Sequence, residues 1–121
     1  MILVDSSVWI DHLRKSEPGL VALLEAGEVV CHPFVIGELA CGHMRQRARL
    51  LDELSLLPQS PVATHSEAML FLERHALSGR GVGWVDVHLL ASAALGAETK
   101  VWSRDKRSMD AARRTGLRHA G

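Results

Sequence analysis

The chain has 121 residues, of which 47% are hydrophobic, and its 14 basic residues balance its 14 acidic residues. This length suits one domain spanning 1–121, and the apolar fraction excludes a disordered polymer. No apolar run approaches the roughly 20 residues of a membrane span, the start lacks the features of a signal peptide, and we expect a cytoplasmic protein that binds no membrane.

Hydrophobic patterning and stop signals predict strands that alternate with helices along the chain. The expected strands are 1–5, 28–32, 62–65 and 99–103. The expected helices cover about 6–14, 16–26, 33–42, 44–57, 66–78, 84–95 and 106–114, the first capped by Ser6 or Ser7. This alternation predicts a three-layer α/β domain with a central parallel β-sheet flanked by helices. The carboxyl ends of its strands then share one edge, where ligands bind in such sheets.

Four acidic residues stand where a carboxylate is costly to place. Asp5 ends the apolar run MILVD, and Asp105 follows the last expected strand. Glu38 in FVIGELACG and Asp86 in GWVDVHLLASA lie on apolar helix faces. Each also has a structural explanation: Asp5 and Asp105 could cap helices, Glu38 could pair with an arginine, and Asp86 could face a helix dipole. As a set, however, all four are placed to meet at one edge of the sheet.

Four converging carboxylates need a compensating charge. Two of them about 4 Å apart repel by roughly 4 kcal/mol at an effective dielectric near 20, and protonation or a cation relieves this. Carboxylates without clustered histidine or cysteine favour hard divalent ions such as Mg²⁺ or Mn²⁺. Such a site activates water and positions a phosphodiester for attack.

These four segments resemble the acidic signatures of PIN-domain ribonucleases. The resemblance rests on VDSSVWID, IGELACG, GWVDVHLLASA and VWSRDKR, in that order. Chain length and element order are similar to the VapC toxins of type II VapBC toxin–antitoxin pairs. The resemblance implies a single PIN domain with Mg²⁺- or Mn²⁺-dependent endoribonuclease activity. It also implies a homodimer and a cognate VapB antitoxin whose C-terminal segment occupies the acidic groove.

By position, the resemblance assigns Asp5 and Asp86 as the primary metal ligands. Glu38 and Asp105 add negative charge to the metal site, either by direct contact with the ion or through a water molecule. Ser7 and Ser103 do not bind the ion themselves but lie next to its ligands. We expect single-stranded or loop RNA, from transfer or ribosomal RNA, as substrate. The basic residues that we expect nearest to it are Arg80, Arg104, Lys106 and Arg107.

Several other residues have a functional and a structural interpretation. Cys31 and Cys41 are interpreted as inert core thiols, and His32 and His88 as surface or core residues rather than metal ligands. Packing is favoured over base stacking for Trp84, beside Asp86. The stretch 44–57 fits an ordinary core-facing helix more simply than a docking site for the antitoxin.

Two other enzyme classes do not fit the same motifs. A haloacid-dehalogenase-type phosphatase needs a second aspartate where Ser7 stands, and a receiver domain needs its phosphoacceptor on a later strand. The alternative that stays open is a PIN-like module that binds RNA or protein without cleavage, with the four acids in a structural role.

Overall fold

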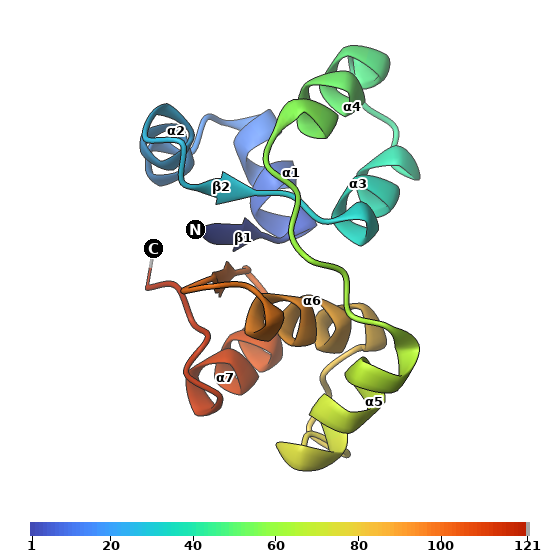
Figure 1. Cartoon of the computed structure of the whole chain (residues 1–121). Helices are drawn as coiled ribbons and strands as arrows, with labels where there is room; N and C mark the ends of the chain where they lie inside the picture. Colours follow the sequence, from blue (N-terminus) through green and yellow to red (C-terminus); the bar gives the residue numbers. More distant parts are fainter. Residues whose placement is uncertain (121) are drawn as a thin grey trace.

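The computed structural model describes residues 1–120, which form three strands and seven helices (Figure 1). The strands are β1 (Ile2–Val4), β2 (Val29–Val30) and β3 (Lys100–Trp102). The helices are α1 (Ser6–Arg14), α2 (Pro18–Glu25), α3 (Pro33–Ala40), α4 (Arg47–Leu56), α5 (His65–Arg74), α6 (Trp84–Leu95) and α7 (Lys106–Arg114). The prediction of an α/β fold with a parallel sheet flanked by helices is confirmed.

Strand β1 is the middle strand of a parallel sheet with the order β2-β1-β3. Its Ile2 pairs with Val29 of β2 on one side and with Lys100 of β3 on the other. In Figure 1, α1 to α4 lie on the β2 side of β1, and α5 to α7 lie on the β3 side. Leu3 and Val4 are fully buried, as expected for a continuously apolar strand in a parallel sheet.

Two aspartates end strands and begin helices in the same way. Asp5 is the N-cap of α1 and accepts a hydrogen bond from the backbone N–H of Ser7. Asp105 is the N-cap of α7 and accepts from the backbone N–H groups of Arg107 and Ser108. The first helix is therefore capped by Asp5 rather than by a serine. A carboxylate suits this position because it meets both the free N–H groups and the positive end of the helix dipole.

The expected strand at 62–65 is wrong. Thr64 instead caps α5 through a capping box with Glu67, and His65 is already helical. The backbone N–H of Ala63 donates to Oγ of Ser92 on α6 rather than to a neighbouring strand. This capping chemistry outweighs the short apolar pattern that suggested a strand.

Three further predictions need correction. The helix expected from residue 44 begins at Arg47, after Gln46 in a left-handed conformation with φ of 52°. The helix expected to reach residue 78 ends at Arg74. Cys31 is buried as predicted, but Cys41 is exposed, because it lies at the end of α3 beyond the core-facing turns. In the described residues, no helix is long and apolar enough to cross a membrane.

Candidate active site

Asp5 is buried at the carboxyl end of β1, and hydrogen bonds concentrate on one of its two oxygens. Oδ2 accepts from Oγ of Ser7 at 2.6 Å and from Oγ of Ser103 at 3.0 Å. The backbone N–H of Asp5 donates to the carbonyl of Trp102, which joins β1 to β3 at this point. Oδ1 accepts no hydrogen bond within the described residues, and it is not among their buried atoms without a partner. One oxygen is thus held by the fold while the other is accessible to a ligand.

Glu38 and Asp86 approach Asp5 from two different helices. Glu38 lies on α3, and its Oε1 accepts a hydrogen bond from Oγ of Ser6 at 3.2 Å. Asp86 lies in the first turn of α6, where the positive end of the helix dipole favours a negative charge. Asp105, at the start of α7, completes the set of four that the sequence predicted; we call it the acidic cluster.

Two members of the acidic cluster feel the charge of the others. Burial, and after it the charges of Asp5, Asp105 and Glu38, raise the pKa of Asp86 to about 6, against a hydrogen bond from the backbone of Gly83. Loss of surrounding water, followed by the charge of Asp5, raises the pKa of Glu38. Each of these carboxylates therefore holds its proton more strongly than it would in water, and a nearby cation would reverse this.

The donor set fits a hard divalent cation. Within residues 1–120, no group of three or more Asp, Glu, His or Cys side chains is arranged to hold a metal ion. Mg²⁺ does not need such a cage, because it is commonly bound by one or two carboxylates, several waters and substrate phosphate oxygens. The accessible Oδ1 of Asp5 and the carboxylate of Asp86 are suitable donors, since ion binding would also relieve their mutual repulsion.

Among the basic residues expected near the RNA, Arg104 is held by ion pairs within the protein. Arg104 binds Asp11 at 3.0 Å and Glu17 at 2.6 Å, and its guanidinium lies 5.4 Å from the ring centre of Trp102. It therefore ties the loop after β3 to α1 and α2. Its backbone N–H also donates to Oγ of Ser7, which in turn holds Asp5.

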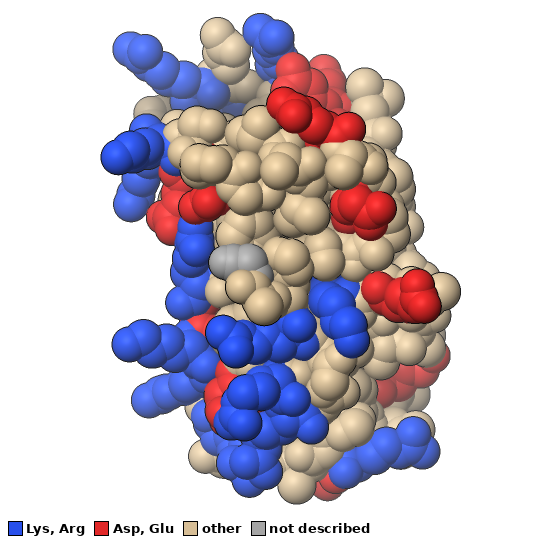
Figure 2. Space-filling model, turned by 90° about the vertical axis from the view of Figure 1, so that its left-hand side faces the viewer, with Lys and Arg blue, Asp and Glu red and all other residues tan. Residues whose placement is uncertain are grey.

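Arg107 lies across the loop that leads into α6. Gly81 in this loop has φ of 77°, and a Cβ there would come within 2.6 Å of Cδ of Arg107. Lys106, Arg107, Arg113 and Arg114 are exposed on α7. Figure 2 shows basic side chains gathered over the lower part of the displayed face, where α7 lies. Arg80 is exposed in the same loop as Gly81, so basic side chains border the helix that carries Asp86.

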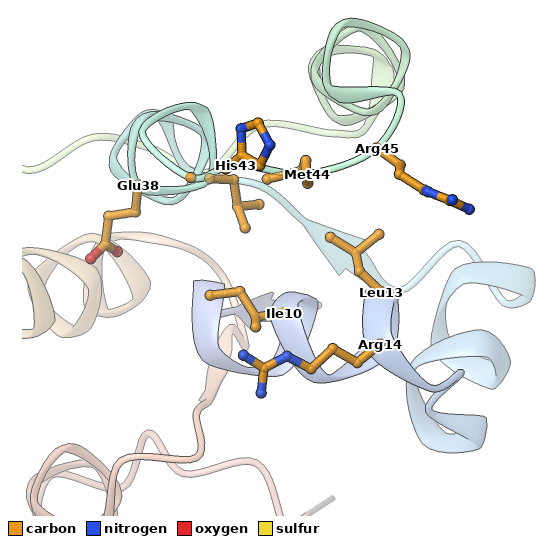
Figure 3. A pocket seen from close by; sticks show the side chains of 9 residues that line it. Ile10, Leu13, Arg14, Glu38, His43, Met44 and Arg45 are labelled. Carbon is orange, nitrogen blue, oxygen red and sulfur yellow. The ribbon is translucent and has the colours of Figure 1, made fainter.

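A pocket of about 420 Å³ adjoins the acidic cluster between α1 and the end of α3 (Figure 3). Its apolar lining includes Ile10, Leu13 and Met44, and its charged lining includes Glu38 and Arg14. The sequence analysis did not single out Ile10, Leu13 or Arg14. Ile10 and Leu13 share one side of α1 at a spacing of three residues, which is the only local signal for this surface.

Comparison with known proteins agrees with this geometry. A family model described as "PIN domain" matches residues 2–114. The chain belongs to the PIN-domain family. Two curated relatives named Ribonuclease VapC32, from Mycobacterium tuberculosis strains CDC 1551 / Oshkosh and ATCC 25618 / H37Rv, are each 50% identical over 117 residues. The alignment covers 97% of this chain and 94% of each relative, so this PIN-domain chain falls within the VapC group.

Proposed function

We propose that this PIN-domain protein is a Mg²⁺- or Mn²⁺-dependent endoribonuclease and the toxin of a type II toxin–antitoxin pair. The observation that carries the proposal is the acidic cluster, where burial and then the charges of Asp5, Asp105 and Glu38 raise the pKa of Asp86 to about 6. Support for RNA as the substrate comes from the curated relatives, which are named ribonucleases.

The proposed roles follow from the hydrogen bonds. Asp5 and Asp86 would hold the metal ion, with Ser7 and Ser103 fixing the orientation of Asp5 through Oδ2. A bound divalent ion supplies a nucleophilic water at neutral pH and neutralises charge on the phosphodiester. Glu38, held by Ser6, and Asp105, held at the start of α7, add the negative charge that attracts the ion.

Binding of the RNA backbone is assigned to the basic residues around α7. Lys106 and Arg107 are exposed beside the N-cap Asp105, and Arg80 lies in the loop before α6. Phosphate contacts of this kind position a nucleic acid without reading its sequence. For Arg104, which was expected to bind RNA, the ion pairs with Asp11 and Glu17 support a positioning role through Ser7 instead.

We assign the pocket between α1 and α3 to the antitoxin. Ile10 and Leu13 are 41% and 45% exposed, and such apolar surface beside an acidic cluster suits an amphipathic segment that carries a basic residue. An arginine reaching from this pocket towards Glu38 would take the place of the metal ion's charge. We also propose that the chain acts as a homodimer.

The test is induced expression of the wild type and of Asp5→Asn, with growth followed and total RNA mapped for new ends. The proposal predicts growth arrest and discrete new RNA ends for the wild type alone. If both soluble, folded proteins leave growth and RNA unchanged, a PIN-like module that binds without cleavage replaces the nuclease.

A further inference from the structure

Four aromatic rings form a continuous chain across three helices, and we call this group the ring cluster. It consists of Phe34 on α3, His65 on α5, and Trp84 and His88 on α6. The ring centres of Phe34 and His88 lie 4.8 Å apart, those of His88 and Trp84 4.6 Å, and those of Trp84 and His65 5.3 Å. These are ordinary distances for tilted and edge-to-face aromatic pairs.

One ring of the ring cluster is buried, and the rings beside it are partly exposed to solvent. His88 is only 5% exposed, whereas Phe34 is 36% exposed and Trp84 39%. The other two tryptophans, Trp9 and Trp102, are each 4% exposed. Trp84 is thus the one tryptophan of this chain with substantial contact to solvent, and its ring is held in place by two neighbours. A fixed aromatic ring loses little conformational freedom when a flat ligand stacks on it.

The ring cluster borders the acidic cluster. Asp86 lies two residues after Trp84 in the first turn of α6, so their backbones are close although their side chains leave the helix on different sides. Phe34 and Glu38 are four residues apart on α3 and therefore lie on the same side of that helix. A nucleotide whose phosphate lies at the acidic cluster would have its base, or that of its neighbour, within reach of these rings.

The chemistry of the ring cluster fits a nucleobase better than an aliphatic protein segment. All four side chains are rings, two of them imidazoles, and no carboxylate belongs to the group. Its residues lie in or near the first turns of α3, α5 and α6, whose positive dipole ends favour a phosphate. Within residues 1–120, two buried side-chain nitrogens lack a hydrogen-bond partner, and one of them, Nδ1 of His88, belongs to the ring cluster.

We propose that the ring cluster stacks an unpaired RNA base next to the bond that is cut, with Trp84 as the principal contact. The proposal rests on the proposed ribonuclease function and adds to it a site for the base. Stacking on an aromatic ring accepts every base, so this contact would select single-stranded RNA rather than a sequence. Cleavage would then favour loops in which a base is free to turn outwards.

Binding is tested first without metal, so that no RNA is cut. Wild-type protein in EDTA is titrated with oligoadenylate while tryptophan emission is recorded, and an abasic ribose-phosphate oligomer of equal length serves as control. We expect oligoadenylate, and not the abasic oligomer, to quench the emission. The Trp84→Phe variant keeps Trp9 and Trp102, so its emission should not respond, although labelled oligoadenylate should bind within about twofold of wild type.

The second part compares affinities. Trp84→Ala and Phe34→Ala should each weaken binding of labelled oligoadenylate by about fivefold or more, whereas Leu56→Ala, at an 84% exposed position on α4, should not. Equal affinity of Trp84→Ala and wild type would overturn the proposal. A change in the molecular mass of Trp84→Ala in solution would also overturn it, because the rings would then contact a second copy. If wild type cleaves RNA but its emission is unaffected by bound RNA, the ring cluster proposal fails and the ribonuclease function stands.

Discussion

Ser103 donates a hydrogen bond to Oδ2 of Asp5 over 3.0 Å, although the two residues are 98 positions apart in the chain. Ser7 donates to the same oxygen, and the two serine hydroxyls lie 3.3 Å from each other. The neighbouring parallel strands β1 and β3 bring these groups together at one edge of the sheet. These hydrogen bonds fix the orientation of the Asp5 carboxylate and leave Oδ1 available to bind a metal ion.

Replacing Ser103 should therefore weaken metal binding without removing a metal ligand. In Ser103→Ala, Asp5 keeps the Ser7 contact but loses one of the two hydroxyls that orient it. We expect the affinity for Mn²⁺ and the rate of RNA cleavage to fall by about tenfold or more, measured by calorimetry and by initial rates. Ser103→Thr keeps the hydroxyl and serves as the matched control. Equal loss in both variants would contradict an orienting role.

Asp86 should lower stability at neutral pH in the absence of metal. Its pKa is raised to about 6 in the folded protein, from an ordinary value near 3.8. The folded state therefore holds a proton that the unfolded state releases, and stability falls as pH rises from about 4 to 6. Asp86→Asn removes this cost and should increase the free energy of unfolding at pH 7.5 in EDTA by about 1–3 kcal/mol.

Urea titrations at pH 7.5 and pH 4 measure this effect, with Asp52→Asn on α4 as a control at an exposed position. The gain for Asp86→Asn should shrink at pH 4, where the wild-type group is already protonated. If Asp86→Asn is less stable than wild type at pH 7.5, the ionised carboxylate of Asp86 does not destabilise the folded protein, and this explanation is contradicted.

Divalent metal should stabilise the folded protein, and protons should compete with it. At pH 7.5, Mg²⁺ or Mn²⁺ should raise the midpoint of thermal unfolding, because the ion binds the folded state and offsets carboxylate repulsion. At pH 5 the shift should be smaller, since Asp86 and Glu38 both have raised pKa values and are more often protonated there. An equal shift in Asp5→Asn would place the bound ion elsewhere.

Ser92 joins three parts of the core and should be sensitive to mutation. Its Oγ lies 3.0 Å from Nε2 of the fully buried His32 and accepts the backbone N–H of Ala63, also at 3.0 Å. Nδ1 of His32 accepts from the backbone N–H of Phe34, so the other ring nitrogen carries the proton and donates to Ser92. Ser92→Ala leaves two buried donors unpaired and should cost about 1–3 kcal/mol of unfolding free energy.

The pH response of His32 has the opposite sign to that of Asp86. Burial lowers the pKa of His32 to about 4, so the stability contributed by its neutral form is lost as pH falls from about 6.5 to 4. Chemical denaturation of wild type and Asp86→Asn across this range separates the two groups. With Asp86 removed, stability should rise more steeply with pH; an unchanged slope would contradict the assignment.

The acidic cluster was predictable from the sequence because its signals are local. Asp5 and Asp105 each follow an apolar strand and precede a helix, and their capping role, the structural alternative for both, is also real. Capping occupies one oxygen of Asp105 and one of Asp5, which leaves the second oxygen of each for the proposed metal site. Glu38 and Asp86 stood out because the residues three and four positions away from them are largely apolar.

Other features depend on contacts between distant segments and could not be predicted. The ion pairs of Arg104 with Asp11 and Glu17 join positions 93 and 87 residues apart. The segment 62–65 has an apolar pattern that suits a strand, but its capping box and the bond to Ser92 decide its conformation. The ring cluster combines residues of three helices, and no local pattern indicated that Phe34 and Trp84 both contact His88.

The most direct test of the central claim is RNA cleavage by purified wild type and Asp5→Asn in a titration of Mg²⁺, with the new ends mapped. We predict cleavage at defined sites that appears with Mg²⁺, disappears in EDTA and is absent from the folded Asp5→Asn protein at every concentration. Cleavage that persists in EDTA, or that Asp5→Asn carries out at the wild-type rate, would contradict a metal-dependent nuclease built on the acidic cluster.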